Sequence, residues 1–197
     1  GPDFGKDILP PMLGAKKIQA HFFDGYWEDI GTIRAFYEAN LALAEAVPKF
    51  NFYDERFMIF TRQRHLPGAK INQANIRSSV LCDGAIVSGS VVEQSVIGLR
   101  SVIAEGAFVH KTVMMGADYY DSPGSRFEDV PDKAPSLGIG HRTIVKNAII
   151  DKNARIAEDC RIVNQENVQH ADGENYYIRD GIVCIPRSAV IPAGTVI

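Results

Sequence analysis

The sequence predicts a mainly β protein, in which a parallel β-helix over residues 71–197 follows a short segment of mixed α/β character. Aliphatic residues recur every six positions through residues 71–197, with turn-forming residues between them. Before residue 47 the pattern instead passes from period two to the period of an α-helix. Neither a helix nor an open strand repeats every six residues, whereas a coil of short faces that each bury one aliphatic side chain does.

The composition is that of an ordinary globular protein, with 46% hydrophobic and 23% charged residues in a chain of 197. A net charge of −3 gives no reason to expect a nucleic-acid partner, and no apolar run is long enough to cross a membrane. Cys82, Cys160 and Cys184 lack metal-ligand spacing, so we expect reduced thiols in a cytoplasmic protein. Because residue 1 is not Met, we also expect a part of a longer chain.

Residues 1–46 are predicted to hold a strand, a turn and a helix. The strand covers residues 18–23, which alternate in polarity, and the helix runs from Ile33 to about Ala46 with Thr32 as its N-cap. The apolar stripe of this helix needs a partner surface, which we expect to lie in sequence upstream of residue 1.

The turn before the helix, residues 25–32, carries two acidic side chains beside the single Trp. Glu28 and Asp29 are open to two interpretations: solvated loop acids, or a carboxylate presented to a magnesium-phosphate site. The spacing of the residues does not decide between them.

Residues 47–70 are predicted to be a linker that packs against its neighbours, because they hold prolines and a glycine and mix aromatic residues with basic ones. Arg62 and Arg64 belong to the basic group. They form either a solvated surface or an anion site, since guanidinium groups bind phosphate in a bidentate fork.

The six-residue repeat of residues 71–197 occurs in four runs, each predicted to place its aliphatic residues in a stacked core. The runs are Val80, Ile86 and Val92; Val96, Val102, Phe108 and Met114; Ile144, Ile150, Ile156 and Ile162; and Ile185, Ile191 and Ile197. Residues 115–142 and 163–181 lose the period, so we expect loops that leave the β-helix.

Candidate functional residues within the repeats are few. Only His110 of the five histidines lies in a clear run, so a three-ligand zinc site is not expected, and GxSxG, GxGxxG and P-loop motifs are absent. Lys152 and Arg187 each precede an inward aliphatic position. With Arg62 and Arg64 they would line a groove for a phosphorylated effector if the linker folds back along the β-helix.

Seven stretches of the chain together resemble the C-terminal portion of glucose-1-phosphate adenylyltransferase, also called ADP-glucose pyrophosphorylase. They are residues 3–7 (DFGKD), 26–32 (YWEDIGT), 64–67 (RHLP), 96–101 (VIGLRS), 115–120 (MGADYY), 150–156 (IDKNARI) and 180–183 (DGIV). The W-x-D-x-G-T element is shared by sugar nucleotidyltransferases in general, whereas MGADYY and IDKNARI are particular to this enzyme.

The resemblance implies the tail of an α/β nucleotidyltransferase domain (residues 1–46), a linker (47–70) and a left-handed β-helix for regulation and tetramer assembly (71–197). The reaction implied is ATP plus glucose 1-phosphate to ADP-glucose and pyrophosphate, with Asp29 as one of two aspartates that hold Mg²⁺. Lys6 and Glu28 are implied substrate-binding residues. Because the rest of the catalytic domain lies outside the chain, we expect the chain alone to be inactive.

The resemblance also implies an allosteric site for a phosphorylated effector, formed by Arg62, Arg64, Lys152 and Arg187. Photosynthetic relatives usually have a lysine at the position of Arg187, so the effector stays open between 3-phosphoglycerate and a sugar phosphate such as fructose 6-phosphate. A homotetramer or heterotetramer is implied, in the cytoplasm, or in a plastid if the source is a plant. The alternatives are a hexapeptide-repeat acyltransferase and a catalytically silent regulatory subunit.

Overall fold

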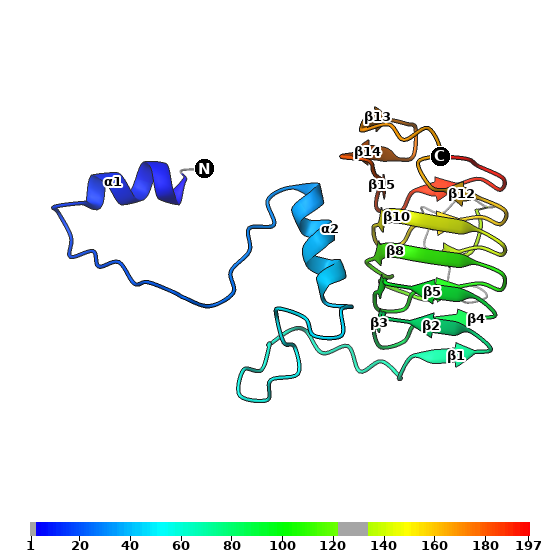
Figure 1. The fold of residues 1–197 in the computed structure, drawn as a ribbon, viewed down its shortest axis with the longest axis horizontal. Helices are drawn as coiled ribbons and strands as arrows, with labels where there is room; N and C mark the ends of the chain where they lie inside the picture. The colour runs from blue at the N-terminus through cyan, green and yellow to red at the C-terminus, as the bar shows by residue number, and fades with distance from the viewer. Residues whose placement is uncertain (1–2, 122–133) are drawn as a thin grey trace.

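A parallel β-helix forms the main body of the protein in the computed structural model, which describes residues 3–121 and 134–197 (Figure 1). Its strands stack on three faces, and every pairing within a face is parallel. The first face consists of β1 (Lys70–Asn72), β4 (Ile86–Ser88), β7 (Val102–Ile103), β9 (Gly138–Ile139), β11 (Arg155–Ile156) and β16 (Val190–Ile191).

The second and third faces are joined by two long strands that turn the corner between them. The second face holds β2 (Asn75–Arg77), β5 (Val91–Glu93), β12 (Arg161–Ile162) and the first halves of β8 (Phe108–Met114) and β10 (Ile144–Ile150). The third face holds the second halves of β8 and β10 with β3 (Val80–Leu81), β6 (Val96–Ile97) and β15 (Ile182–Ile185).

The corner between these two faces is made by residues with positive φ. Lys111 in β8 (φ 45°) and Asn147 in β10 (φ 51°) take the left-handed conformation, which is uncommon for residues other than Gly. Gln94 does the same one coil earlier than Lys111, and Ser78 two coils earlier. One such residue redirects the chain, so the strand continues on the next face without a loop.

The predicted six-residue spacing is confirmed in the core, but its register is wrong in part of the chain. Ile150, Ile156 and Ile162 are buried as expected, and so are Ile185, Ile191 and Ile197. In the earlier run the buried residues are Ile97, Ile103 and Val109, each one position after the predicted Val96, Val102 and Phe108. Likewise Val87 and Val145 are buried in place of Ile86 and Ile144. Neighbouring side chains in a strand point to opposite faces, and here both neighbours are apolar.

The two predicted interruptions have more structure than expected. Within residues 115–142 the period resumes at β9, and residues 122–133 of the predicted loop lie outside the described part of the chain. Within residues 163–181 the chain forms a hairpin of β13 (His170–Asp172) and β14 (Tyr177–Arg179), and β14 pairs antiparallel with β15. The second interruption therefore extends the sheet at the C-terminal end of the β-helix.

The chain before residue 33 lies away from the β-helix (Figure 1). A π-helical turn, η1 (Phe4–Ile8), continues into the short helix α1 (Leu9–Met12), and no strand forms at residues 18–23. The predicted strand is absent because no other described segment pairs with its backbone groups, which are left to solvent. Phe22 is 88% exposed.

Helix α2 (Ile33–Ala42) packs against the third face of the β-helix, so the prediction that its partner lies upstream of residue 1 is wrong. Thr32 caps it as predicted, with Oγ1 accepting from the Ala35 N–H at 3.1 Å, although the helix ends four residues before Ala46. Buried Tyr37 packs with Val113, Ile149 and Ile182.

Polar contacts fix helix α2 on the β-helix. The Tyr37 hydroxyl donates to the Lys111 carbonyl at 2.6 Å, and burial, with Glu38 nearby, raises the pKa of Tyr37 to about 12. Arg34 donates to the Asp180 carbonyl at 2.6 Å in the turn between β14 and β15. The helix therefore spans from the β8 corner to the C-terminal hairpin.

The linker between α2 and β1 packs less than predicted. Its aromatic side chains are largely exposed; Phe57 is 77% and Phe60 88% exposed. Packing is found near its end, where Leu66 is half-buried and the Pro67 carbonyl accepts from the Gly84 N–H at 2.7 Å. The linker is thus attached to the first coil of the β-helix.

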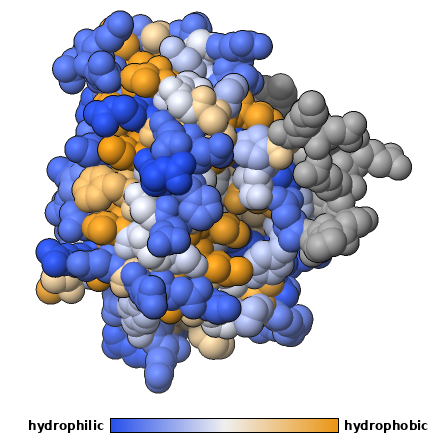
Figure 2. Space-filling view, turned by 90° about the vertical axis from the view of Figure 1, so that its right-hand side faces the viewer, coloured by the Kyte–Doolittle hydropathy of each residue, from blue (hydrophilic) through white to orange (hydrophobic). Residues whose placement is uncertain are grey.

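On the side of the β-helix away from α2, hydrophobic side chains lie in small groups between hydrophilic ones (Figure 2). This mixed surface is what a strand buried on one face only produces, because outward and inward residues alternate. The core therefore lies inside the coil and, to a smaller extent, under α2.

Candidate functional site

The corner between the third and first faces brings residues of successive coils into one row. Arg100 N donates to the Asp83 carbonyl at 3.2 Å, Asn153 N to Gly116 at 3.1 Å and Ser188 N to Lys152 at 2.9 Å. Because these bonds stack one coil directly on the next, Lys152 and Arg187 lie on neighbouring coils. We call the row that contains Arg100, Lys152 and Arg187 the basic corner.

The side chains of Lys152 and Arg187 meet at the carboxylate of Asp118. Lys152 Nζ donates to Asp118 Oδ1 at 3.1 Å, and Arg187 NH2 donates to Asp118 Oδ2 at 2.6 Å. The amide of Asn153 donates to Oδ2 at 3.1 Å and accepts from the Asp118 N–H at 2.8 Å. Two cations thus converge on one anion at the surface.

The cluster is accessible to solvent and carries an excess positive charge. The side chains of Lys152, Arg187 and Asp118 are 30%, 59% and 38% exposed. Partial burial acts to raise the pKa of Asp118, but the hydrogen bonds from Lys152 and Asn153 and the charges of Lys152 and Arg187 together lower it. Asp118 is therefore ionised at neutral pH, and one positive charge of the two cations stays uncompensated by it.

An ion pair with a buried arginine holds the segment that carries Asp118. Arg155, whose side chain is 6% exposed, contacts Asp121 through two nitrogens, at 2.9 and 2.8 Å, and donates to the Pro135 carbonyl at 2.8 Å. Asp121 also accepts from the Leu137 N–H at 2.8 Å. Both described ends of the excursion between β8 and β9 are therefore fixed to the β-helix.

The same segment runs back along the basic corner toward the first coil. The Tyr120 hydroxyl donates to the Gly84 carbonyl at 2.8 Å, and the Arg100 guanidinium lies 5.9 Å from the centre of the Tyr120 ring. Gly84 has φ +72°, and a Cβ there would collide with the Tyr120 hydroxyl. Glycine is thus favoured at position 84 by its left-handed backbone, and a side chain there would displace the Tyr120 hydroxyl.

Arg62 and Arg64 are exposed and are not brought onto Lys152 and Arg187 by any contact in the described chain. Arg64 NH1 donates to the Arg62 carbonyl at 3.1 Å, and neither guanidinium forms an ion pair with a described residue. Pro67, three residues after Arg64, contacts Gly84 at the first-coil end of the basic corner. Of the four predicted effector residues, the structure thus brings together Lys152 and Arg187 only.

The N-terminal candidates Lys6, Glu28 and Asp29 are all exposed. Lys6 belongs to η1, which lies well away from the start of α2 (Figure 1), so the structure does not bring Lys6 to Asp29. Glu28 lines a shallow depression of about 360 Å³ with Tyr26, Arg34 and Lys49.

The carboxylate of Asp29 can serve as one ligand of a magnesium ion. Its Oδ1 accepts from the Gly31 N–H at 3.0 Å, which fixes the carboxylate at the turn before α2. Mg²⁺ in phosphate-transfer sites is held by one or two carboxylates together with substrate phosphates. The exposed carboxylate fits such a role, and among the described residues no group of three metal-ligating side chains forms.

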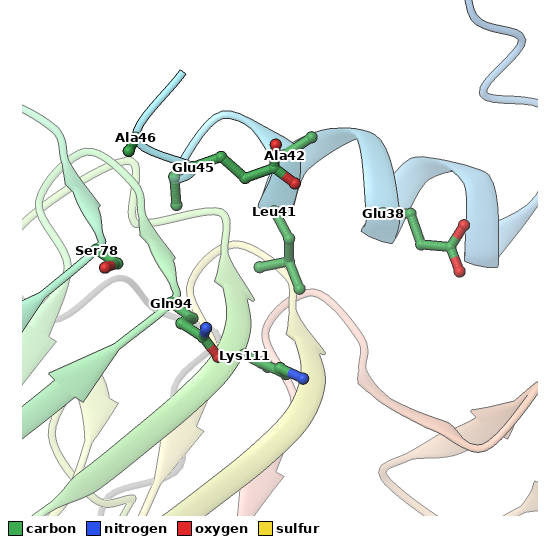
Figure 3. A pocket seen from close by; sticks show the side chains of 9 residues that line it. Glu38, Leu41, Ala42, Glu45, Ala46, Ser78, Gln94 and Lys111 are labelled. Atoms are coloured by element: carbon green, nitrogen blue, oxygen red, sulfur yellow. The ribbon is translucent and has the colours of Figure 1, made fainter. Parts of the chain in front are cut away.

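A groove of about 480 Å³ separates the C-terminal end of α2 from the corner of Ser78, Gln94 and Lys111 (Figure 3). The side chains of Gln94 and Lys111 lie next to each other on the β-helix side, opposite Leu41 of the helix (Figure 3). Charges of both signs line the groove, since Glu38 of α2 and Glu45, three residues after its end, line it together with Lys111. Its lining does not select a ligand class.

Histidine and cysteine side chains form no catalytic arrangement in the described residues. His21, His65, His141 and His170 are exposed, and His110 Nδ1 lies 3.7 Å from Glu93 Oε2. Burial raises the pKa of the thiols of Cys82, Cys160 and Cys184, which keeps them in the unreactive protonated form.

Asp118, Asn153 and Arg155 are site residues that the sequence pattern did not predict. Each lies in a stretch already singled out, Asp118 in MGADYY and the other two in IDKNARI. For Asp118 the signal was an acidic residue four positions after Met114, the last residue of a six-residue run.

Similarity to known proteins agrees with this architecture. The family described as the GLGC left-handed parallel beta-helix domain matches residues 64–196, and the nucleotidyl transferase family matches residues 1–46. The chain belongs to the GLGC left-handed β-helix family, so its parallel coil is left-handed.

A named relative covers nearly the whole chain. The chain is 43% identical, over 199 aligned positions and 99% of its length, to the protein named glucose-1-phosphate adenylyltransferase small subunit, chloroplastic/amyloplastic, of Triticum aestivum. It spans 42% of the length of that wheat protein. No helix in the described residues is both long and apolar enough to pass through a lipid bilayer.

Proposed function

We propose that the chain is the C-terminal part of a glucose-1-phosphate adenylyltransferase, which converts ATP and glucose 1-phosphate to ADP-glucose and pyrophosphate. The observation that carries this proposal is the 43% identity to the wheat small subunit across 99% of the chain. The match of residues 1–46 to the nucleotidyl transferase family supports a catalytic domain to which these residues belong.

In this proposal Asp29 contributes one carboxylate to a Mg²⁺ site, with Glu28 and Lys6 near the substrates. When bound, the ion would neutralise charge on the reacting phosphates. The turn that ties Asp29 Oδ1 to the Gly31 N–H holds the carboxylate in place ahead of α2. Preorganisation of this kind lowers the barrier, since the carboxylate needs no reorientation during the reaction.

The β-helix is proposed to bind a phosphorylated effector at the basic corner and to support assembly with further subunits, as a homotetramer or a heterotetramer. Convergence of Lys152 and Arg187 within hydrogen-bonding distance of one carboxylate supports the effector site, because a phosphate presents the same kind of oxygen acceptors. The compartment is proposed to be the cytoplasm or, as the name of the wheat relative indicates for that protein, a plastid.

The proposed reaction is tested by an assay for ADP-glucose with ATP, glucose 1-phosphate and Mg²⁺. We expect the complete protein that contains this chain to form ADP-glucose and the 197 residues alone to form none, because the described residues form no group of three metal-ligating side chains and only residues 1–46 match the nucleotidyl transferase family. Turnover by the 197 residues alone would contradict this division of roles. A complete protein that is folded but inactive would favour a catalytically silent regulatory subunit.

The effector site is tested by removing one charge from the basic corner. We expect Lys152→Gln in the complete protein to raise the effector concentration for half-maximal response by about tenfold, the size of one lost charge-assisted hydrogen bond. The measurement is a titration with 3-phosphoglycerate and, separately, fructose 6-phosphate.

Arg142→Gln is the matched control for this titration, because it also removes one positive charge from a surface ion pair, that of Arg142 with Asp159 at 2.6 Å, at another corner. Equal responses of Lys152→Gln and the parent to both compounds would remove Lys152 from the effector site.

A further inference from the structure

Asp118 takes up the donors of the basic corner that a bound anion would need. Its two carboxylate oxygens accept from Lys152 Nζ at 3.1 Å and from Arg187 NH2 at 2.6 Å. A phosphate that bridged the same two cations would present its oxygens to the same nitrogens. The carboxylate and a bridging phosphate therefore exclude each other.

We propose that Asp118 is an internal competitor for the anion site, whose carboxylate must turn away before a phosphate bridges Lys152 and Arg187. The inference rests on the proposed effector site and deepens it, since it names the residue that sets how tightly the site binds. In the absence of ligand Asp118 keeps the two cations paired.

The displacement requires only a side-chain rotation, because the backbone of Asp118 is held independently of its carboxylate. The Asp118 N–H donates to Asn153 Oδ1 at 2.8 Å, and Asn153 is 6% exposed. On either side, the Ala117 N–H donates to the Leu99 carbonyl at 2.7 Å, and Asp121 is fixed by Arg155. The Asp118 side chain is 38% exposed, so space for rotation lies on the solvent side.

Charge favours the exchange for a phosphate dianion. Asp118 supplies one negative charge against the two positive charges of Lys152 and Arg187, whereas a phosphate monoester carries about −1.5 to −2 at pH 7. Asp151, the residue before Lys152, also carries a carboxylate, and its Oδ1 accepts from the Lys152 backbone N–H at 2.6 Å. Asp151 therefore does not compete for the side-chain nitrogen through that oxygen.

The test is a calorimetric titration of the 197-residue chain with inorganic phosphate at low ionic strength. We expect Asp118→Asn to bind phosphate about 3- to 10-fold more tightly than the parent, because asparagine keeps the shape and removes the charge. Asp118→Ala is expected to change affinity in the same direction. Thermal unfolding of each variant checks that the fold is retained.

Asp159→Asn is the matched control, since Asp159 pairs with Arg142 in an exposed ion pair at a different corner. It lowers the total negative charge by the same amount and is expected to change phosphate affinity less than twofold. An equal gain from Asp159→Asn and Asp118→Asn would contradict the proposal, because a general electrostatic effect would then account for both.

Two further variants separate this inference from the proposed effector site. In one outcome Lys152→Gln and Arg187→Gln abolish phosphate binding, whereas Asp118→Asn leaves it unchanged or weakens it. This outcome would contradict the role of Asp118 as a competitor but would support the anion site itself. In another outcome neither Lys152→Gln nor Arg187→Gln affects phosphate binding, or neither the parent nor Asp118→Asn binds phosphate at all. Either result would contradict both the anion site and the role of Asp118 as its competitor.

Discussion

Replacing Ile156 by alanine is expected to lower the free energy of unfolding by about 2–5 kcal/mol. Ile156 is fully buried in the first face, where β11 lies between β9 and β16. Its neighbours in the stack, Ile139 and Ile191, are also buried. The shorter alanine side chain leaves a cavity in the core. Each coil contacts only the coils next to it, so the structure can close this cavity only in part.

The measurement is denaturant unfolding followed by circular dichroism, with Ile71→Ala as the control. Ile71 occupies the equivalent position in β1, at the open end of the same face. It pairs with Val87 of β4 and is 53% exposed. We expect the control to cost less than about 1 kcal/mol. Equal losses for the two variants would mean that the stacked core does not determine stability.

Replacing Asp29 by asparagine in the complete protein is expected to lower the rate of ADP-glucose formation on the order of 100-fold. Asparagine keeps an oxygen that can accept from the Gly31 N–H, as Asp29 Oδ1 does at 3.0 Å, so the turn before α2 is preserved. What is lost is the negative charge offered to Mg²⁺.

The rate is measured over a range of Mg²⁺ concentrations, with Asp24→Asn as the control for an exposed acid in the same extended segment. We expect the loss in Asp29→Asn to be largest at low Mg²⁺ and the control to behave as the parent. Unchanged turnover of Asp29→Asn at limiting Mg²⁺ would exclude its role as a ligand.

The β-helix could be predicted from the sequence because every coil repeats the same physical requirement. One aliphatic side chain per face must enter a narrow core, and this requirement leaves a period of six in residues such as Ile150, Ile156 and Ile162. The inward register could not be predicted where two aliphatic residues are adjacent, as at Val96 and Ile97. There, strand pairing selects the buried residue.

The candidate site was predictable only as far as it follows from the repeat. Lys152 and Arg187 stand at the same corner of neighbouring coils, so stacking alone brings them together. Asp118 reaches them through a segment that leaves the repeat, and its position depends on the Arg155 contact with Asp121, which no period encodes. The position of Arg62 and Arg64 likewise depends on a linker without a repeat.

Helix α2 has a consequence for where the chain can be divided. It lies within the match to the nucleotidyl transferase family, residues 1–46, yet its buried face belongs to the β-helix through Tyr37. A β-helix excised at residue 47 would lose this cover and present Val113, Ile149 and Ile182 to water. The natural boundary for exchanging the two modules between related enzymes is therefore the extended stretch before Thr32, where the described chain makes few contacts with the β-helix.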